Sequence, residues 1–195
     1  MTTLFILIWL FPLPATFPVS ESAAFRIIHG ERILGELTAS KTTAGERDIY
    51  LNNTLVRTRI VRQIEVLYQT RVVYQSGVLQ EADVTVTVNG SPYARTLTKK
   101  SGSGYQVFRD GKLKQTLSQP ITHSYIMLLF GEPLGVRSCY SEEGGVFNAI
   151  EPGGAATYSK INSKGRRTTY HYENRNLQRI DIDAGIMEFE MIRQP

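Results

Sequence analysis

The chain has 195 residues, of which 42% are hydrophobic and 21% are charged, and its formal net charge at pH 7 is +4. This is the composition of an ordinary globular protein, and it excludes a disordered, collagen-like or coiled-coil chain. A single cysteine, Cys139, excludes an internal disulfide framework and a cysteine-rich zinc site. Because no apolar run reaches the roughly 18 residues that a membrane-spanning helix needs, the sequence predicts no transmembrane segment.

The N-terminus has the pattern of a secretory signal peptide. Residues 4–11 are all apolar, and they are followed by prolines and then by small residues at 22–24. A short apolar core before small residues at a cleavage point is typical of an exported precursor. The sequence therefore predicts a signal peptide over residues 1–24, export to the periplasm or the extracellular space, and one folded domain over residues 25–195. The alternative is that the apolar run is a first buried strand.

Beyond residue 25, apolar and polar residues alternate with a period of two. Alternation is clear in residues 33–39, 56–70, 82–88, 180–183 and 187–191. The apolar runs are separated by turn-like pairs or clusters at His29-Gly30, Asn89-Gly90, Asp110-Gly111, 173–176 and Ala184-Gly185. A period of two is typical of half-buried strands that face a core on one side and water on the other. We therefore predict an all-β, mainly antiparallel fold, a long curved meander sheet or half-barrel of about ten to twelve strands with one short helix.

Two segments depart from this alternation. Residues 99–104, with the sequence KKSGSG, are predicted to form a flexible loop that is too short for a domain linker. Residues 121–130 are apolar on most sides, and Thr122 could cap a short helix that ends at Gly131 and Pro133. A buried strand is the alternative for so short a run. We predict the helix, packed against the sheet.

Several short motifs follow one another along the chain. They are Ile33-Leu34-Gly35, Val88-Asn89-Gly90, Phe130-Gly131-Glu132-Pro133, Tyr140-Ser141-Glu142 and Tyr170-His171-Tyr172. Their order resembles an uncharacterised family of exported bacterial β-meander proteins, classed as a domain of unknown function. The resemblance spans nearly all of residues 25–195 and implies a curved antiparallel meander with a short helical insert. It implies no activity and assigns no catalytic residue, and Cys139 departs from it, because a hydrophobic residue would fit better there.

The sequence holds no motif of a known catalytic or cofactor site. It contains no P-loop, no Rossmann glycine fingerprint, no G-x-S-x-G elbow and no H-E-x-x-H zinc motif. No two of the three histidines have the spacing of metal ligands, so we predict no metal, no cofactor and no catalytic residue. Cys139 beside a histidine would resemble a Cys/His hydrolase, but a lone cysteine in a β run is more often a small buried hydrophobe.

Polar residues in and around a Gly/Pro-rich stretch form one candidate site. Glu132 and Glu142 lie near Arg137 in the sequence, and loops of special conformation often carry function. His123 and His171 could join them as an acid or a base. These five residues are the possible polar site. The alternative is that each is an ordinary strand or turn residue.

A hairpin near the C-terminus carries carboxylates on both strands. If Ala184-Gly185 is a two-residue turn, Asp181 faces Glu188 and Arg179 faces Glu190. Two facing carboxylates could hold calcium or serve a hydrolase. A water-exposed face with neighbouring arginines is the simpler interpretation.

Basic residues are concentrated in two blocks. Residues 95–114 and 160–179 each hold six Lys or Arg against one acidic residue, and aromatic residues are interspersed among them. Such surfaces bind acidic glycans, lipid headgroups or nucleic acid, and nucleic acid is the least fitting of these for an exported protein. The candidate ligand-binding residues are Lys99, Lys100, Arg109, Lys112, Arg166, Arg167, Tyr170 and Tyr172. The alternative is that the basic residues protect strand edges from pairing.

Together these features favour a non-enzymatic binding or carrier module for a lipophilic or anionic envelope component, with no nucleic-acid partner. A half-barrel with an apolar inner face would supply the hollow for such a ligand. One alternative is a hydrolase that works through carboxylates or histidine. Another is a structural or protein-interaction module at the cell surface, which adds a partner strand to an exposed sheet edge.

Overall fold

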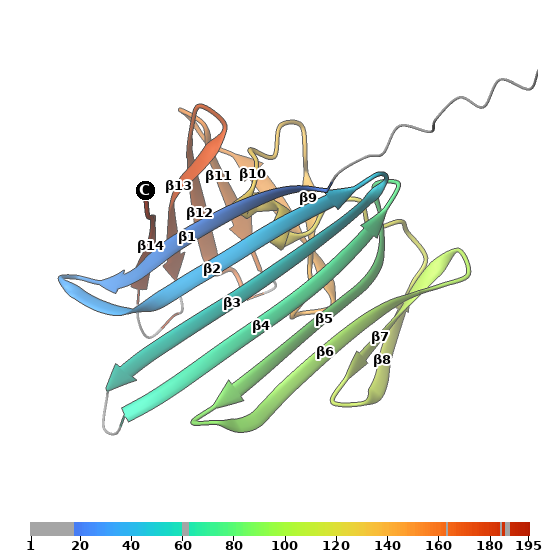
Figure 1. Cartoon of the computed structure of the whole chain (residues 1–195), viewed down its shortest axis with the longest axis horizontal. Coiled ribbons are helices and arrows are strands. Elements are labelled where there is room, and N and C mark those ends of the chain that lie inside the picture. Colours follow the sequence, from blue (N-terminus) through green and yellow to red (C-terminus); the bar gives the residue numbers. More distant parts are fainter. Residues whose placement is uncertain (1–17, 60–62, 163, 184, 186–187) are drawn as a thin grey trace, which may run out of the picture.

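A computed structural model describes residues 18–59, 63–162, 164–183, 185 and 188–195. Its 14 strands form one antiparallel sheet (Figure 1). The first eight strands are β1 (Val19–His29), β2 (Arg32–Ala44), β3 (Arg47–Arg59), β4 (Gln63–Gln75), β5 (Val78–Val88), β6 (Ser91–Ser101), β7 (Gly104–Arg109) and β8 (Lys112–Leu117). A 3-10 helix, η1 (Tyr125–Leu129), precedes β9 (Ser138–Ser141), β10 (Val146–Pro152), β11 (Thr157–Ile161), β12 (Arg167–Glu173), β13 (Asn176–Asp183) and β14 (Glu188–Arg193).

Consecutive strands pair from β1 to β8 and from β9 to β14, and β1 joins β14 between these two runs. The order is β8-β7-β6-β5-β4-β3-β2-β1-β14-β13-β12-β11-β10-β9. In the β1–β14 ladder Phe25 lies opposite Arg193 and Ile27 opposite Met191, and the Gln194 N–H donates to the Ala24 carbonyl over 2.8 Å. The all-β, antiparallel prediction is confirmed, and this long-range ladder joins two meanders into one sheet.

Short hairpins connect the long strands, and two of them have the backbone that their sequences predict. Asn89 and Gly90 have φ angles of 49° and 76°, and Asp110 and Gly111 have φ angles of 50° and 78°. Positive φ at both central residues belongs to the type I′ turn, whose twist matches that of the flanking strands. The turn predictions at these two positions are confirmed.

Alternation sends one side of each long strand toward the core. In β5, Ala82, Val84 and Val86 are at most 4% exposed, whereas the residues between them are half-buried on the other face. The predicted strand at residues 82–88 is therefore present with the predicted inner side.

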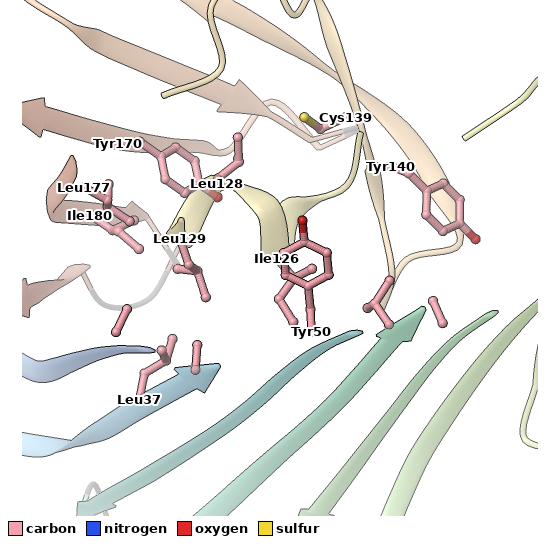
Figure 2. Close-up of a cluster of buried hydrophobic side chains, with 14 of the residues drawn as sticks. Leu37, Tyr50, Ile126, Leu128, Leu129, Cys139, Tyr140, Tyr170, Leu177 and Ile180 are labelled. Atoms are coloured by element: carbon pink, nitrogen blue, oxygen red, sulfur yellow. The ribbon is translucent and has the colours of Figure 1, made fainter. Parts of the chain in front are cut away.

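The sheet is curved, so that strands β9 to β14 lie across the concave side of the wall formed by β2 to β6 (Figure 1). Helix η1 fills part of the space between these two walls. Its Ile126, Leu128 and Leu129 side chains are buried there (Figure 2). The Tyr172 hydroxyl of β12 donates to the Leu128 carbonyl over 2.8 Å and thereby attaches η1 to the second wall.

The two ends of the sheet, β8 and β9, are not joined by a ladder of backbone hydrogen bonds, and side chains of β6 and β8 instead bond to β9 and the turn that follows it. The Thr98 and Tyr140 hydroxyls lie 2.7 Å apart, and the Thr96 hydroxyl donates to the Glu143 carbonyl over 2.8 Å. The Gln115 side-chain amide donates to the Gly145 carbonyl. The sheet is therefore open, and the hairpin between β9 and β10 packs against β6 to β8.

The prediction of ten to twelve strands is wrong, because the sheet has 14. The short strands β8, β9 and β11 have the sequences KLKQTL, SCYS and TYSKI, in which apolar and polar residues do not alternate regularly. The alternating run at residues 56–70 also belongs to two strands, since β3 ends at Arg59 and β4 begins at Gln63.

The predicted flexible loop at residues 99–104 is also wrong. Strand β6 continues to Ser101 and β7 begins at Gly104, so that only a tight turn separates them. Gly102 supplies the left-handed backbone of this turn with a φ of 59°. Lys99 and Lys100 are consequently strand residues.

The predicted helix within residues 121–130 is present as five residues of 3-10 helix. Its N-cap is Ser124 and not Thr122, and the Ser124 side chain makes no capping hydrogen bond. The segment is packed against the sheet, as predicted.

The register expected for the last hairpin is wrong by two residues. Asp181 pairs with Glu190, and Arg179 pairs with Ile192. The connection between β13 and β14 is longer than the two-residue turn that Ala184-Gly185 suggests; Ala184 itself lies outside the described residues.

The apolar run at residues 4–11 lies outside the described residues, so the signal peptide stays a prediction. Strand β1 begins at Val19, before the predicted cleavage point, and residues 19–24 pair with residues 38–43 of β2. Cleavage there would remove this part of the ladder and leave the pairing of β1 with β14, which starts at Phe25. None of the helices in the described ranges has the length and apolar character to cross a membrane.

Candidate functional site

A cavity of about 340 Å³ lies beside η1 in the space between the two walls; we call it the inner cavity. Its apolar lining comes from the long strands and η1, and includes Leu37, Val56, Val84, Leu129, Ile180, Phe189 and Met191. Its charged lining residues are Glu142, Glu143 and Lys160, and Tyr125 and Tyr170 also border it. The concave face of the sheet is thus partly filled by η1 and partly hollow.

Glu142 is a buried carboxyl group of the inner cavity, only 4% exposed. It lies in the turn between β9 and β10, and its Oε1 accepts the Ile126 N–H over 2.9 Å. This bond satisfies a backbone donor in the first turn of η1. Burial raises the pKa of Glu142 above its ordinary value, although hydrogen bonds to the carboxylate oppose the rise.

Lys160 brings a positive charge to the same cavity from β11. Its Nζ lies 4.1 Å from the centroid of the Tyr125 ring, which is the geometry of a cation–π contact. Burial lowers the pKa of the Lys160 ammonium, and the negative charges of Glu142 and Glu143 oppose that shift. Within the part of the chain that the structure describes, Lys160 forms no ion pair.

We compare the free energy of unfolding of Glu142→Gln with that of the wild type. The difference is expected to shift in favour of the variant as the pH rises. A buried acid with a raised pKa keeps its proton in the folded protein at a pH where the unfolded chain, with a pKa near ~4.3, has lost it. The folded state then binds more protons than the unfolded state, so its stability falls as the pH rises from about 4.3 through the raised pKa. Glutamine stays neutral and can accept the same Ile126 N–H bond.

Urea unfolding at a series of pH values would measure the free energy of unfolding of Glu142→Gln and of the wild type. The matched control is Glu143→Gln, because Glu143 is the exposed neighbour in the same turn. For this control we expect the difference from the wild type to stay constant. A Glu142→Gln difference that is also constant would contradict a buried neutral carboxyl group.

A family model described as a domain of unknown function, DUF6134, matches residues 25–194. The chain belongs to the DUF6134 family. The resemblance to an uncharacterised β-rich family is therefore confirmed.

The structure is also similar to a crystal structure titled as a beta-barrel-like protein of domain of unknown function DUF1849 from Brucella abortus. The TM-score is 0.56 at 11% sequence identity, and the match covers 93% of this chain and 97% of the other. At this identity the likeness concerns the fold alone. Among curated proteins, none matches the chain significantly.

This DUF6134 domain separates the five residues of the possible polar site. Glu142 lines the inner cavity, whereas His123 and Glu132 line a second depression of about 270 Å³. Glu132 accepts a hydrogen bond from the Tyr158 hydroxyl over 2.8 Å. Arg137 is exposed just before β9.

The fifth member, His171, lies on the outer face of β12, between the inward-facing Tyr170 and Tyr172. Its Nε2 is 2.6 Å from Asp181 Oδ2, and the Arg179 Nε donates to Asp181 Oδ1 over 2.7 Å. Burial would raise the pKa of Asp181, but the bonds to Arg179 and His171 hold it below its ordinary value. This cluster is a surface ion-pair network. In the described ranges, no group of three or more His, Cys, Asp or Glu residues could hold a metal ion.

The eight candidate ligand-binding residues separate into an outer basic set and an inner pair of tyrosines. Tyr170 and Tyr172 are 5% and 6% exposed, and Tyr170 borders the inner cavity. The basic members, all exposed or half-exposed, are Lys99, Lys100, Arg109, Lys112, Arg166 and Arg167. Two of them form ion pairs. Lys99 Nζ lies 3.7 Å from a carboxylate oxygen of Glu81, and a guanidinium nitrogen of Arg167 lies 3.6 Å from a carboxylate oxygen of Glu151.

Seven strands separate β6 from β12 in the strand order, so the two basic blocks are not on neighbouring strands. Within β12, alternation sends Tyr170 and Tyr172 inward and Arg167 and His171 outward. The alternative that basic residues protect strand edges from pairing fits Lys112, which lies on the edge strand β8, whereas β6 and β12 are interior strands.

Cys139 is a buried strand residue that is 0% exposed. Burial raises the pKa of its thiol to about 12, which is the opposite of what a nucleophilic cysteine needs. The interpretation of Cys139 as a small buried hydrophobe fits this environment.

Sequence reasoning missed the role of Lys160 and Tyr125 as cavity residues. Lys160 stands two positions after Tyr158 in β11, so strand alternation places both side chains on the inner face. The sequence of β11, TYSKI, does not alternate apolar and polar residues, so it did not indicate which side chains face inward. The position of Tyr125 follows from the packing of η1, which no local pattern encodes.

Proposed function

We propose that this protein binds a small, mainly apolar molecule in the inner cavity and does not transform it. The observation that supports the proposal is the hollow of about 340 Å³ between two walls of one curved sheet. Protein interiors are normally packed to the density of organic crystals. Its lining combines apolar side chains with three charged residues and with the polar side chains of Asn52, Thr54, Thr70, Ser141 and Thr168. A space of this size with convergent polar groups is typical of a ligand site.

The size of the inner cavity restricts the ligand. Small-molecule sites range from about 300 to about 1,000 Å³, so a volume of about 340 Å³ is near the lower end. Such a volume corresponds to about eleven waters at liquid density. We therefore propose a single-chain or small-ring ligand and not a lipid with two chains.

A carrier role outside the cytosol belongs to the same proposal. The family match begins at residue 25, directly after the predicted cleavage point, which supports export of the domain. The hydrolase alternative has less support, because Glu142 lines the inner cavity, His123 and Glu132 line the second depression, and His171 lies on the outer face of β12.

Substitution of Val84 by phenylalanine is expected to weaken binding of a neutral apolar probe, octanol, by at least about ten-fold, which corresponds to about 1.4 kcal/mol. Val84 is 3% exposed and lines the inner cavity, so the larger ring would take space from the ligand. Isothermal titration calorimetry with the purified protein would measure the affinity.

The matched control is Thr85→Phe, which places the same ring on the next residue of β5 and on the outer face. Circular dichroism would check that both variants are folded. Equal loss of octanol binding in the two variants, or no binding to the wild type, would overturn the proposal.

A further inference from the structure

The charges of the inner cavity point to the chemical class of its ligand. We propose that Lys160 binds an anionic head group, so that the inner cavity takes a medium-chain monocarboxylate. This inference rests on the proposed binding function and names the ligand class.

Lys160 differs from the other basic residues because its charge lies inside without a contacting carboxylate. Among the residues that the structure describes, the basic side chains within ion-pair distance of a carboxylate include Lys41, Arg57, Arg71, Arg95, Lys99, Arg167 and Arg179. Among the described residues, the contact found for the Lys160 ammonium is the Tyr125 ring at 4.1 Å. A cation that is partly withdrawn from water without a contacting anion is costly, and an anionic ligand would offset that cost.

The two glutamates of the cavity do not take this role. Glu142 Oε1 is held by the Ile126 N–H, and neither Glu142 nor Glu143 comes within ion-pair distance of Lys160 in the described chain. Burial raises the pKa of Glu142, which favours its neutral form. Glu143 is exposed at the rim. An anionic ligand therefore meets one half-buried lysine that has neither glutamate within ion-pair distance.

The apolar part of such a ligand has a separate place in the cavity. Lys160 comes from β11 and Glu142 from the turn after β9, at one end of the sheet order. Leu37, Val84 and Met191 come from β2, β5 and β14, on the other wall and at the junction of the two walls. The β2–β6 wall also carries the polar side chains of Asn52, Thr54 and Thr70, and the apolar chain of a carboxylate would lie along Leu37, Val84 and Met191.

The probes are octanoate, octanol and octylamine, which share one chain and differ in the head group. Octanoate has about ten non-hydrogen atoms, close to the roughly eleven waters that the cavity volume would hold. Calorimetric titration of the purified protein is expected to give an affinity for octanoate at least about ten-fold higher than for octanol. Lys160→Met should abolish the preference for octanoate, so that octanoate and octanol bind the variant with similar affinity. Lys164→Met, an exposed lysine close by in the sequence, is the control and should keep the preference.

The outcomes separate this inference from the proposed function. Equal binding of octanoate and octanol by the wild type would overturn the role of Lys160 and leave the binding function standing. A preference for octanoate that survives in Lys160→Met would also overturn it, as would tighter binding of octylamine. Absence of binding by all three probes would overturn the proposed function itself. The comparison of head groups on the wild type stays informative even where Lys160→Met does not fold.

Discussion

Replacement of Gly35 by alanine is expected to lower the free energy of unfolding by about 3 kcal/mol, the upper part of the usual range for overpacking. Gly35 lies in β2, between Ile27 of β1 and Val56 of β3. A Cβ atom at this position would overlap the Leu55 carbonyl oxygen and lie 3.0 Å from the Val56 Cα. Both atoms belong to the backbone, so no change of side-chain rotamer relieves the overlap, and β2 and β3 must move apart.

Thermal and urea unfolding of Gly35→Ala would measure the effect, and for a chain of this length about 3 kcal/mol corresponds to a fall in Tm of roughly 6–12 °C. The matched control is Gly131→Ala, because a Cβ at Gly131 meets nothing within 4 Å. Its free energy of unfolding should change by less than about 0.5 kcal/mol. If the two variants were equally stable, the close approach of β2 and β3 at Gly35 would be refuted.

The features of the fold that could be predicted from the sequence are those that depend on neighbouring residues. Alternation over residues 82–88 places Ala82, Val84 and Val86 inside, because successive side chains of a strand point to opposite faces. The Asn89-Gly90 pair predicts its hairpin, because both residues tolerate positive φ. The Ile33-Leu34-Gly35 motif supported the family resemblance, and the structure gives a steric reason for its glycine.

The features that could not be predicted depend on contacts between segments that are distant in the sequence. The pairing of β1 with β14 needs Ile27 to meet Met191, and no local pattern encodes that choice. The sequence leaves Glu142 as a member of a polar site or an ordinary turn residue, and its burial depends on η1, whose Ile126 N–H it accepts. Lys160 was counted as part of a basic block, and only the curvature of the sheet shows that its charge lies inside.

The period of two also explains why the predicted ligand-binding residues lie on both faces of the sheet. A block of basic and aromatic residues in a strand sends its members to both faces, since the period is two. Tyr170 and Tyr172 therefore belong to the core, while Arg167 and His171 face outward in the same strand. Only a helix or a loop could bring these four side chains to one site. Because the segment is strand β12, they do not form a single ligand site.

Substitution of Leu129 by alanine is expected to lower the free energy of unfolding by about 2–3 kcal/mol and to enlarge the inner cavity. Leu129 of η1 is 6% exposed, and it lies between the two walls, with Leu37 on one side and Ile180 on the other (Figure 2). Part of its side chain already borders the hollow, so it loses fewer contacts than a fully enclosed leucine, and the cost falls in the lower half of the usual range.

The enlarged cavity gives Leu129→Ala a second readout, which packing alone would not change. The variant should bind decanoate more tightly relative to octanoate than the wild type does, because the removed methyl groups leave room for a longer chain. Leu134→Ala is the control, since Leu134 is 55% exposed, and it should change neither stability nor chain-length preference. A Leu129→Ala variant that loses stability but keeps the chain-length preference of the wild type would show that η1 supports the two walls without bounding the ligand.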